Sequence, residues 1–184
     1  IASCILTNKV VLKNVPLVKD IETMLNLLSS IGSKIKINHQ NKTIKIDNPK
    51  KLKTIAKYQL VKTMRAGVLV LGPLLAKYGK ATVSLPGGCS IGPRPIDLHI
   101  SALKKMGAKI KIINGYIHAT AKYGLKGAKI NFKKVSVGAT ENLIIAACMA
   151  NGKTILNNCA SEPEIKDLTN FLVKIGSKIR WINK

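Results

Sequence analysis

A cysteine and an arginine lie five residues apart in a Gly- and Pro-rich stretch, residues 84–99, that reads SLPGGCSIGPRPIDLH. Cys89 follows two glycines, which permit unusual backbone conformations and leave backbone N–H groups accessible. Positive surroundings favour the thiolate, so Cys89 is a candidate reactive thiol. Arg94 offers a planar set of donors that matches a phosphate or a carboxylate. The pattern indicates thiol chemistry beside an anionic group.

The end of this stretch carries two further polar residues, each with a structural alternative. Asp97 is placed to cap the helix that follows, or to contact a ligand. His99 falls in the first turn of that helix, as a structural histidine or as a ligand contact. Arg65 stands out because lysine supplies nearly all other positive charge, which suggests that a point charge is not sufficient there.

A second candidate for anion binding is KKVSVGATENL, residues 133–143. Lys134, Ser136 and the backbone at Gly138 precede a helix that the pattern predicts to begin near Thr140. A helix N-terminus with hydroxyl and ammonium donors favours phosphate. The GxxxxGK[ST] motif is absent from the sequence, so nothing supports ordinary nucleotide hydrolysis.

Other reactive residue types give weaker signals. Glu162 and Glu164 begin a third helix, where acids usually complement the helix dipole. Three histidines and eight acids assemble into no convincing Ser–His–Asp set or zinc cluster, and we predict neither a metal site nor a cofactor. Cys4 and Cys148 lie in apolar runs and are expected to be small buried side chains.

The scaffold for these candidates is a segment that occurs three times, starting at Lys9, Lys80 and Lys153. Each copy predicts a short strand, an amphipathic helix, a glycine C-cap and a second strand. The cap glycines are Gly32, Gly107 and Gly176. The runs KIKINHQNKTIKID and KIKIINGYIHATA predict hairpins, and the nearly apolar helices before each strand should be buried.

The second copy is longer than the others: 27 positions separate Lys80 from Gly107, against 23 in the other two copies. The strand is expected to begin one residue differently in this copy, so a net insertion of about three residues remains. It falls within GGCSIGPRP, and packing does not require it. We predict one α/β (α+β) domain over residues 1–184, with pseudo-threefold character around buried helices. The predicted units are approximately 9–80, 80–152 and 153–184, the last one incomplete.

Composition narrows the function classes. The net charge is +23, yet only three of 31 basic residues are arginine and the lysines are spread along the chain, which weakens a nucleic-acid-binding function. An anionic small-molecule partner fits the charge equally well. The sequence contains no run of eighteen apolar residues and no secretory pattern at its start. We therefore expect no membrane span, and reduced cysteines in a cytoplasm.

Four segments in this order resemble the UDP-N-acetylglucosamine 1-carboxyvinyltransferases: LVKTMRAG, SLPGGCSIGPRPIDLHI, KVSVGATENLI and EPEIKDLTNFL. The resemblance covers essentially the whole chain. It implies a two-lobed transferase, each lobe built from three βαβαββ units. Such enzymes transfer the enolpyruvyl group of phosphoenolpyruvate to the 3-hydroxyl of UDP-N-acetylglucosamine and release phosphate. This is the first committed step of peptidoglycan synthesis, and hence serves cell wall biogenesis and cell division.

The resemblance also implies residue roles. Cys89 would protonate the methylene carbon of phosphoenolpyruvate and form a covalent adduct at C2, and Arg94 would hold the phosphate. Glu162 and Glu164, which the repeat places at the position corresponding to the insertion, are expected to support the residues that contact the substrate without touching it themselves. The implied substrate contacts are Arg65, Arg94, Pro95, Ile96, Asp97, Leu98, His99, Lys134, Ser136, Val137 and Gly138.

Two parts of the family pattern have no counterpart in the chain: a Lys-Asn pair near the N-terminus and the second lobe with its general-base aspartate. We therefore expect this chain to have little or no turnover alone. A non-catalytic remnant and a basic nucleic-acid-binding domain are the alternatives. The loop cysteine predicts sensitivity to a phosphonate epoxide of the fosfomycin type.

Overall fold

The computed structural model describes residues 1–62, 64–86 and 96–182 of the chain. The strands are β1 (Lys9–Leu12), β2 (Lys34–Asn38), β3 (Thr43–Asp47), β4 (Ile55–Ala56), β5 (Lys80–Ser84), β6 (Lys109–Ile113), β7 (Tyr116–Thr120), β8 (Lys129–Asn131) and β9 (Ile155–Asn157). The helices are η1 (Ala2–Leu6), α1 (Lys19–Ser30), α2 (Tyr58–Val61), η2 (Arg65–Val70), α3 (Leu71–Tyr78), α4 (Asp97–Lys105), α5 (Val137–Ala147) and α6 (Pro163–Lys174); η1 and η2 are 3₁₀ helices.

The strands form three small sheets, in the orders β1-β3-β2, β4-β5-β7-β6 and β8-β9. Both predicted hairpins are confirmed: β2 pairs antiparallel with β3, and β6 with β7. Asn114 and Gly115 connect β6 to β7 with φ of 50° and 76°. Positive φ at both turn residues is the signature of the tight hairpin turn whose twist matches that of its strands.

The three outer helices α1, α4 and α6 end in the same way, which confirms the predicted glycine caps. Gly32, Gly107 and Gly176 have φ of +113°, +91° and +105°. The N–H of the residue after each glycine closes the helix onto a carbonyl five residues back, the bond of a Schellman cap. These bonds run from Ser33 to Leu28, from Ala108 to Leu103 and from Ser177 to Leu172, at 3.0, 3.1 and 3.0 Å.

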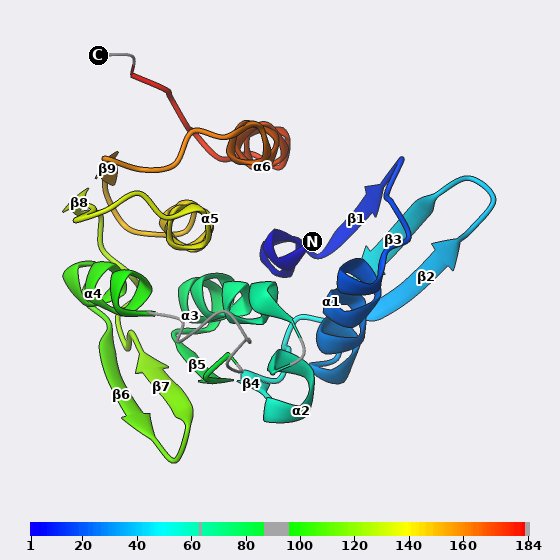
Figure 1. The fold of residues 1–184 in the computed structure, drawn as a ribbon, viewed down its shortest axis with the longest axis horizontal. Coiled ribbons are helices and arrows are strands. Elements are labelled where there is room, and N and C mark those ends of the chain that lie inside the picture. Colours follow the sequence, from blue (N-terminus) through cyan, green and yellow to red (C-terminus); the bar gives the residue numbers. More distant parts are fainter. Residues whose placement is uncertain (63, 87–95, 183–184) are drawn as a thin grey trace.

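Helix α3 lies toward the centre of the molecule, whereas the hairpins β2–β3 and β6–β7 lie at its periphery (Figure 1). Leu71, Leu74 and Leu75 of α3 are fully buried, as is Leu143 of α5, so the predicted burial of these apolar helices is confirmed. The core is aliphatic, as the low aromatic content of 4% requires. Among the described residues, no helix is both long and apolar enough to cross a bilayer.

The apolar segment 61–79 does not form one continuous helix, contrary to the pattern. Met64 is extended, with φ −139° and ψ 131°, and separates α2 from η2. Pro73 then occupies the first turn of α3, where a missing N–H is not needed by the helix. Gly67 packs directly on the backbone of Val61, because a Cβ there would lie 3.0 Å from the Val61 Cα. The break thus falls at Met64, and η2 runs directly into α3.

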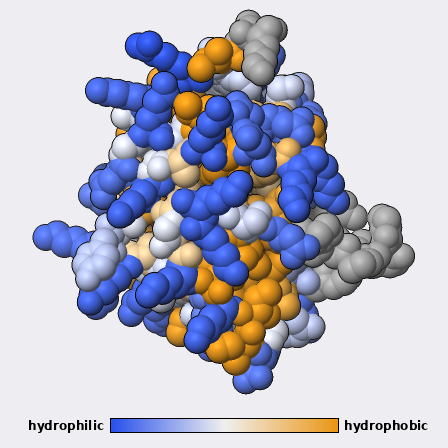
Figure 2. All heavy atoms as spheres, turned by 90° about the vertical axis from the view of Figure 1, so that its left-hand side faces the viewer, coloured by the Kyte–Doolittle hydropathy of each residue, from blue (hydrophilic) through white to orange (hydrophobic). Residues whose placement is uncertain are grey.

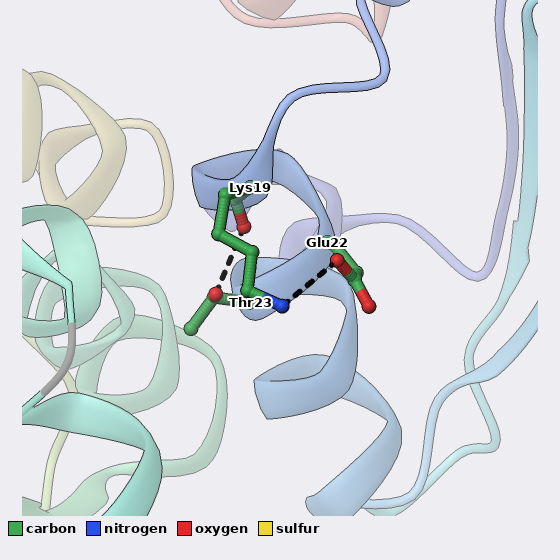
Figure 3. Close-up of polar contacts among 3 residues, drawn as sticks. All are labelled: Lys19, Glu22 and Thr23. Atoms are coloured by element: carbon green, nitrogen blue, oxygen red, sulfur yellow. Dashed lines mark hydrogen bonds and ion pairs between the residues drawn. The ribbon is translucent and has the colours of Figure 1, made fainter.

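Helix α1 illustrates the surface chemistry of the outer helices. Lys19 Nζ lies 3.2 Å from Glu22 Oε2, and the Thr23 hydroxyl donates to the Lys19 carbonyl at 2.9 Å (Figure 3). Both charged side chains are mostly exposed, so this pair contributes little to stability. Ion pairs are few: the described part of the chain has one other, between Lys45 and Asp47.

Candidate functional site

The structure describes only part of the predicted site. Cys89, Arg94 and Pro95 lie outside the described residues, as does the side chain of Arg65, whose backbone begins η2. The described candidates fall at the N-termini of three helices. They are Ile96, Asp97, Leu98 and His99 at α4, Lys134, Ser136, Val137 and Gly138 at α5, and Glu162 and Glu164 at α6.

The start of α4 alternates between core and surface. Ile96 is the N-cap residue and is buried, and Leu98 packs partly against the core. Asp97 is exposed and is the first helical residue. Its predicted capping role is wrong, because the cap position belongs to Ile96 and no side-chain bond caps this helix. The Asp97 carboxylate is therefore not engaged in capping and faces solvent beside the helix N-terminus.

The start of α5 lies three residues earlier than predicted, at Val137, because Ser136 acts as the cap. The Ala139 N–H donates to Ser136 Oγ at 3.3 Å, and the Thr140 N–H donates to the Ser136 carbonyl at 3.0 Å. In a capped helix the first two N–H groups, here those of Val137 and Gly138, have no partner within the helix. They point out of the positive end of the helix dipole, next to the exposed Lys134.

The two segments meet at His99 and Gly138. A Cβ on Gly138 would lie 3.7 Å from His99 Cε1 and 3.9 Å from Nε2, so the imidazole edge rests against the first turn of α5. His99 is only 6% exposed. Burial lowers its pKa from 6.5 to about 4, so the ring is neutral at physiological pH. The predicted structural role of His99 and its ligand role are compatible with this position.

The acids of α6 lie beside α5. Glu162 is the N-cap residue of α6, and its Oε2 accepts the Ser161 N–H at 2.8 Å, whereas Glu164 lies in the first turn and is exposed. Glu141 of α5 is half-buried, and burial, followed by the charge of Glu164, raises the pKa of its carboxyl.

Sequence reasoning did not single out three polar residues of α5: Thr140, Glu141 and Asn142. The Thr140 hydroxyl accepts the Ala160 N–H at 3.0 Å and so ties α5 to the segment before α6. Asn142 is fully buried and bonds to His99. A signal was present, since three consecutive polar residues interrupt an otherwise apolar helix. Within the described residues, no cluster of His, Cys, Asp and Glu could hold a metal ion.

The geometry suits an anionic ligand with a polar extension. The N-termini of α4 and α5 come together where His99 contacts Gly138. These two helix starts carry the exposed Lys134, the free carboxylate of Asp97 and the neutral imidazole of His99. Backbone N–H groups and a helix dipole bind phosphate oxygens without a dedicated charged pocket. The exposed Asp97 carboxylate can only accept hydrogen bonds, so it suits a part of the ligand that carries N–H donors.

Comparison with solved structures identifies the fold. The enolpyruvyl transferase NikO from Streptomyces tendae superposes with a TM-score of 0.80 at 16% identity, over 99% of this chain and 42% of that chain. An EPSP synthase from Acinetobacter baumannii gives a TM-score of 0.68 at 16% identity, over 90% of this chain and 39% of that chain. The chain therefore has the α/β fold of the enolpyruvyl transferases.

Sequence relatives are much closer. A protein of Pelagibacter ubique is 64% identical over 100% of this chain and 44% of its own length. One from Coxiella burnetii is 49% identical over 97% of this chain and 41% of its own length. Both are named UDP-N-acetylglucosamine 1-carboxyvinyltransferase. The chain thus spans less than half the length of these curated relatives.

The family-level match covers the whole chain. The model of the EPSP synthase (3-phosphoshikimate 1-carboxyvinyltransferase) family matches residues 1–184. The relatives and this family model are both named for carboxyvinyl transfer. The chain belongs to the EPSP synthase family of enolpyruvyl transferases, on the branch whose members are named UDP-N-acetylglucosamine 1-carboxyvinyltransferase.

Proposed function

We propose that this chain forms one lobe of a two-lobed UDP-N-acetylglucosamine 1-carboxyvinyltransferase, with its three repeat units around the buried helices. One observation carries the proposal: His99 of α4 rests against Gly138 of α5. The family resemblance assigns segments 94–99 and 134–138 to the same sugar nucleotide. Their contact across more than thirty residues of sequence supports a common ligand.

The sugar nucleotide would lie across the two helix starts. The N–H groups of Val137 and Gly138, with the Lys134 ammonium, would bind the diphosphate. Asp97 and Leu98 would contact the uridine, with the carboxylate accepting from the base. These assignments use groups that the fold leaves available for binding, since Asp97 and Lys134 are exposed.

The chemistry would centre on Cys89 and Arg94, as the family resemblance implies. The 3-hydroxyl oxygen of the sugar bonds to C2 of phosphoenolpyruvate while the Cys89 thiol protonates C3. C3 then returns a proton to the Cys89 thiolate, and the bond between C2 and the phosphate oxygen breaks. Inorganic phosphate is released and the enolpyruvyl ether remains. Arg94 would stabilise the phosphate, and a base in the second lobe would take the hydroxyl proton.

UDP-N-acetylglucosamine, rather than shikimate 3-phosphate, is the proposed acceptor substrate. The family description names 3-phosphoshikimate, but relatives at 49–64% identity carry the UDP-N-acetylglucosamine name. The cysteine loop is a feature of the UDP-N-acetylglucosamine enzymes and is absent from the shikimate enzymes. We assign the reaction to peptidoglycan synthesis and place it in the cytoplasm. The free thiols of Cys4, Cys148 and Cys159 would stay reduced in that compartment.

Calorimetric titration of this chain tests the binding half of the proposal. UDP-N-acetylglucosamine should bind and shikimate 3-phosphate should not. Lys134→Met should weaken binding of the sugar nucleotide about tenfold or more, because a hydrogen bond to a charged group contributes about 1.5–3 kcal/mol. Lys133→Met is the matched control, because Lys133 is an exposed lysine one residue away. Equal losses in both variants would indicate non-specific attraction instead.

A chimera tests the catalytic half. The matching 44% of the Pelagibacter ubique relative would be replaced by this chain, and phosphate release from the two substrates would be measured. The chimera should turn over, its Cys89→Ala variant should lose at least about a hundredfold in kcat, and this chain alone should be inactive. Near-normal turnover by the chain alone would contradict the two-lobed proposal.

A further inference from the structure

Asn142 is a fully buried polar side chain at the point where α5 meets three other helices. It projects from α5 among apolar neighbours such as Leu143. Its Oδ1 accepts the Gly72 N–H of α3 at 2.7 Å. Its Nδ2 lies 3.3 Å from the Val68 carbonyl of η2 and 3.0 Å from His99 Nδ1 of α4. Both polar atoms of the amide therefore have partners, and leaving either of them unpaired would cost about 1–3 kcal/mol.

The donors and acceptors of this network can be assigned without ambiguity. The Gly72 backbone N–H can only donate, so the amide oxygen of Asn142 must face it. The amide nitrogen therefore faces the Val68 carbonyl and His99, and it can only donate to both. His99 Nδ1 accepts this bond and so carries no proton. The ring proton of the neutral imidazole is then on Nε2.

The amide has no room to rotate away. A Cβ on Gly72 would lie 2.3 Å from Asn142 Oδ1 and 2.5 Å from its carbonyl oxygen, so the backbone of α3 is in direct contact with α5 at this point. Such contact fixes the orientation of the Asn142 amide, and through it the plane of the His99 ring. The ring edge formed by Cε1 and Nε2, next to Nδ1, is the edge that rests on Gly138.

We propose that Asn142 is a positioning residue for the sugar nucleotide: it holds His99 as the neutral, Nε2-protonated tautomer, so that Nε2–H is presented as a donor to ligand oxygens at the N-terminus of α5. This inference rests on the proposed function, because it concerns the same site. Asn142 itself touches no substrate and acts through His99. The neutral Nε2–H would give the ligand a directional hydrogen bond beside Gly138 and would add no positive charge to that of Lys134.

The first test needs no ligand. Nitrogen NMR of the ring-labelled protein near neutral pH should show His99 with Nε2 protonated and Nδ1 bare. Asn142→Asp keeps an oxygen for Gly72 but places a carboxylate oxygen against Nδ1, so both ring nitrogens should become protonated. A bare Nε2 in the wild-type protein would overturn the inference, and this spectrum decides the point even if Asn142→Asp does not fold.

The second test uses a matched pair at His99, with UDP-N-acetylglucosamine as the probe. His99→Asn keeps an acceptor for Asn142 but has no donor at the position of Nε2, and its affinity should fall about tenfold, the loss of a good hydrogen bond. His99→Gln reaches that position with an amide N–H and should stay within about threefold of wild type. A merely structural His99 would not separate the two variants.

The outcomes distinguish this inference from the function on which it rests. Equal, wild-type-like binding by both His99 variants overturns the positioning role and leaves the proposed function intact. A wild-type protein with the predicted tautomer that binds no UDP-N-acetylglucosamine overturns the proposed function, and the ligand role of His99 with it. Circular dichroism of each variant verifies that the fold is retained.

Discussion

The imidazole of His99 is neutral inside the protein, and acidification should penalise that state. Burial lowers its pKa to about 4 from the ordinary 6.5. Between these two values the unfolded chain binds a proton at this position that the folded chain does not. The free energy of unfolding should therefore fall as pH drops from 6.5 toward 4, by up to about 3 kcal/mol from this group alone.

Urea unfolding at several pH values would measure the effect, with His99→Gln as the control. Carboxyl groups titrate in the same range, so the difference between wild type and His99→Gln isolates the histidine. That difference should be flat above about pH 7 and should shrink below it. A difference that stays constant throughout the range would show that His99 is not held neutral.

The cysteines should differ in reactivity according to their burial. Cys4 is almost completely buried, and burial raises the pKa of its thiol. Burial also raises the pKa of the Cys148 thiol, which donates to the Ile144 carbonyl at 3.2 Å. Because the thiolate is the nucleophile, both should resist alkylation. We expect a fosfomycin-type epoxide or iodoacetamide to modify Cys89 first, as peptide mapping by mass spectrometry would detect.

At the scale of elements, the contact between α3 and α5 depends on the absence of a side chain at Gly72. Gly72→Ala would place a methyl group 2.3 Å from Asn142 Oδ1, so a helix must shift. We expect a loss of about 3 kcal/mol in the free energy of unfolding, the upper range for overpacking. Gly138→Ala is the control, since its nearest neighbour outside the helix would be an ordinary 3.7 Å away. That variant should unfold within about 1 kcal/mol of wild type.

Elements governed by local chemistry could be predicted from the sequence. Gly32, Gly107 and Gly176 end their helices because the left-handed cap favours glycine, wherever the helix packs. The start of α5 was misplaced because Ser136 and Thr140 are both good caps, and Thr140 is instead used to bond Ala160. The choice between them depends on a tertiary contact that the local sequence does not encode.

The site could be predicted only in part, for a similar reason. Asp97 and Gly138 were found as candidates because loops and helix starts carry recognisable signals. Asn142 was not, because its importance arises from Gly72, Val68 and His99 meeting around it, and these residues lie 43 to 74 positions away from it in the sequence. Partners that come together only on folding leave no spacing to detect.

At the scale of the whole molecule, the dominant feature is a charge of +23 with few compensating pairs. Lysines lie on all three sheets, with Lys45 on β3, Lys111 on β6 and Lys129 on β8. Hydrophilic side chains cover most of the face shown in Figure 2, around a smaller apolar area. This dispersed charge does not favour a nucleic-acid-binding function, which calls for a concentrated basic surface.

Self-repulsion of this charge should make stability depend on salt. Raising the salt concentration from about 0.05 M to about 0.5 M shortens the screening length to a few ångströms and removes most repulsion between surface lysines. We expect Tm to rise by several degrees, since about 1 kcal/mol corresponds to 2–4 °C in a chain of this length. Calorimetry in sodium chloride would measure it, and a falling Tm would show that attraction between charges dominates.

The only tryptophan of the chain, Trp181, lies at the edge of the fold and not in the core. Its indole N–H donates to Thr169 Oγ1 of α6 at 3.3 Å, and the residue is 46% exposed. Intrinsic fluorescence of this protein is therefore a probe of one local contact. Detachment of residues 178–182 from α6 should change the emission before helix content falls, so denaturation followed by fluorescence alone would report fraying of this segment as if it were global unfolding.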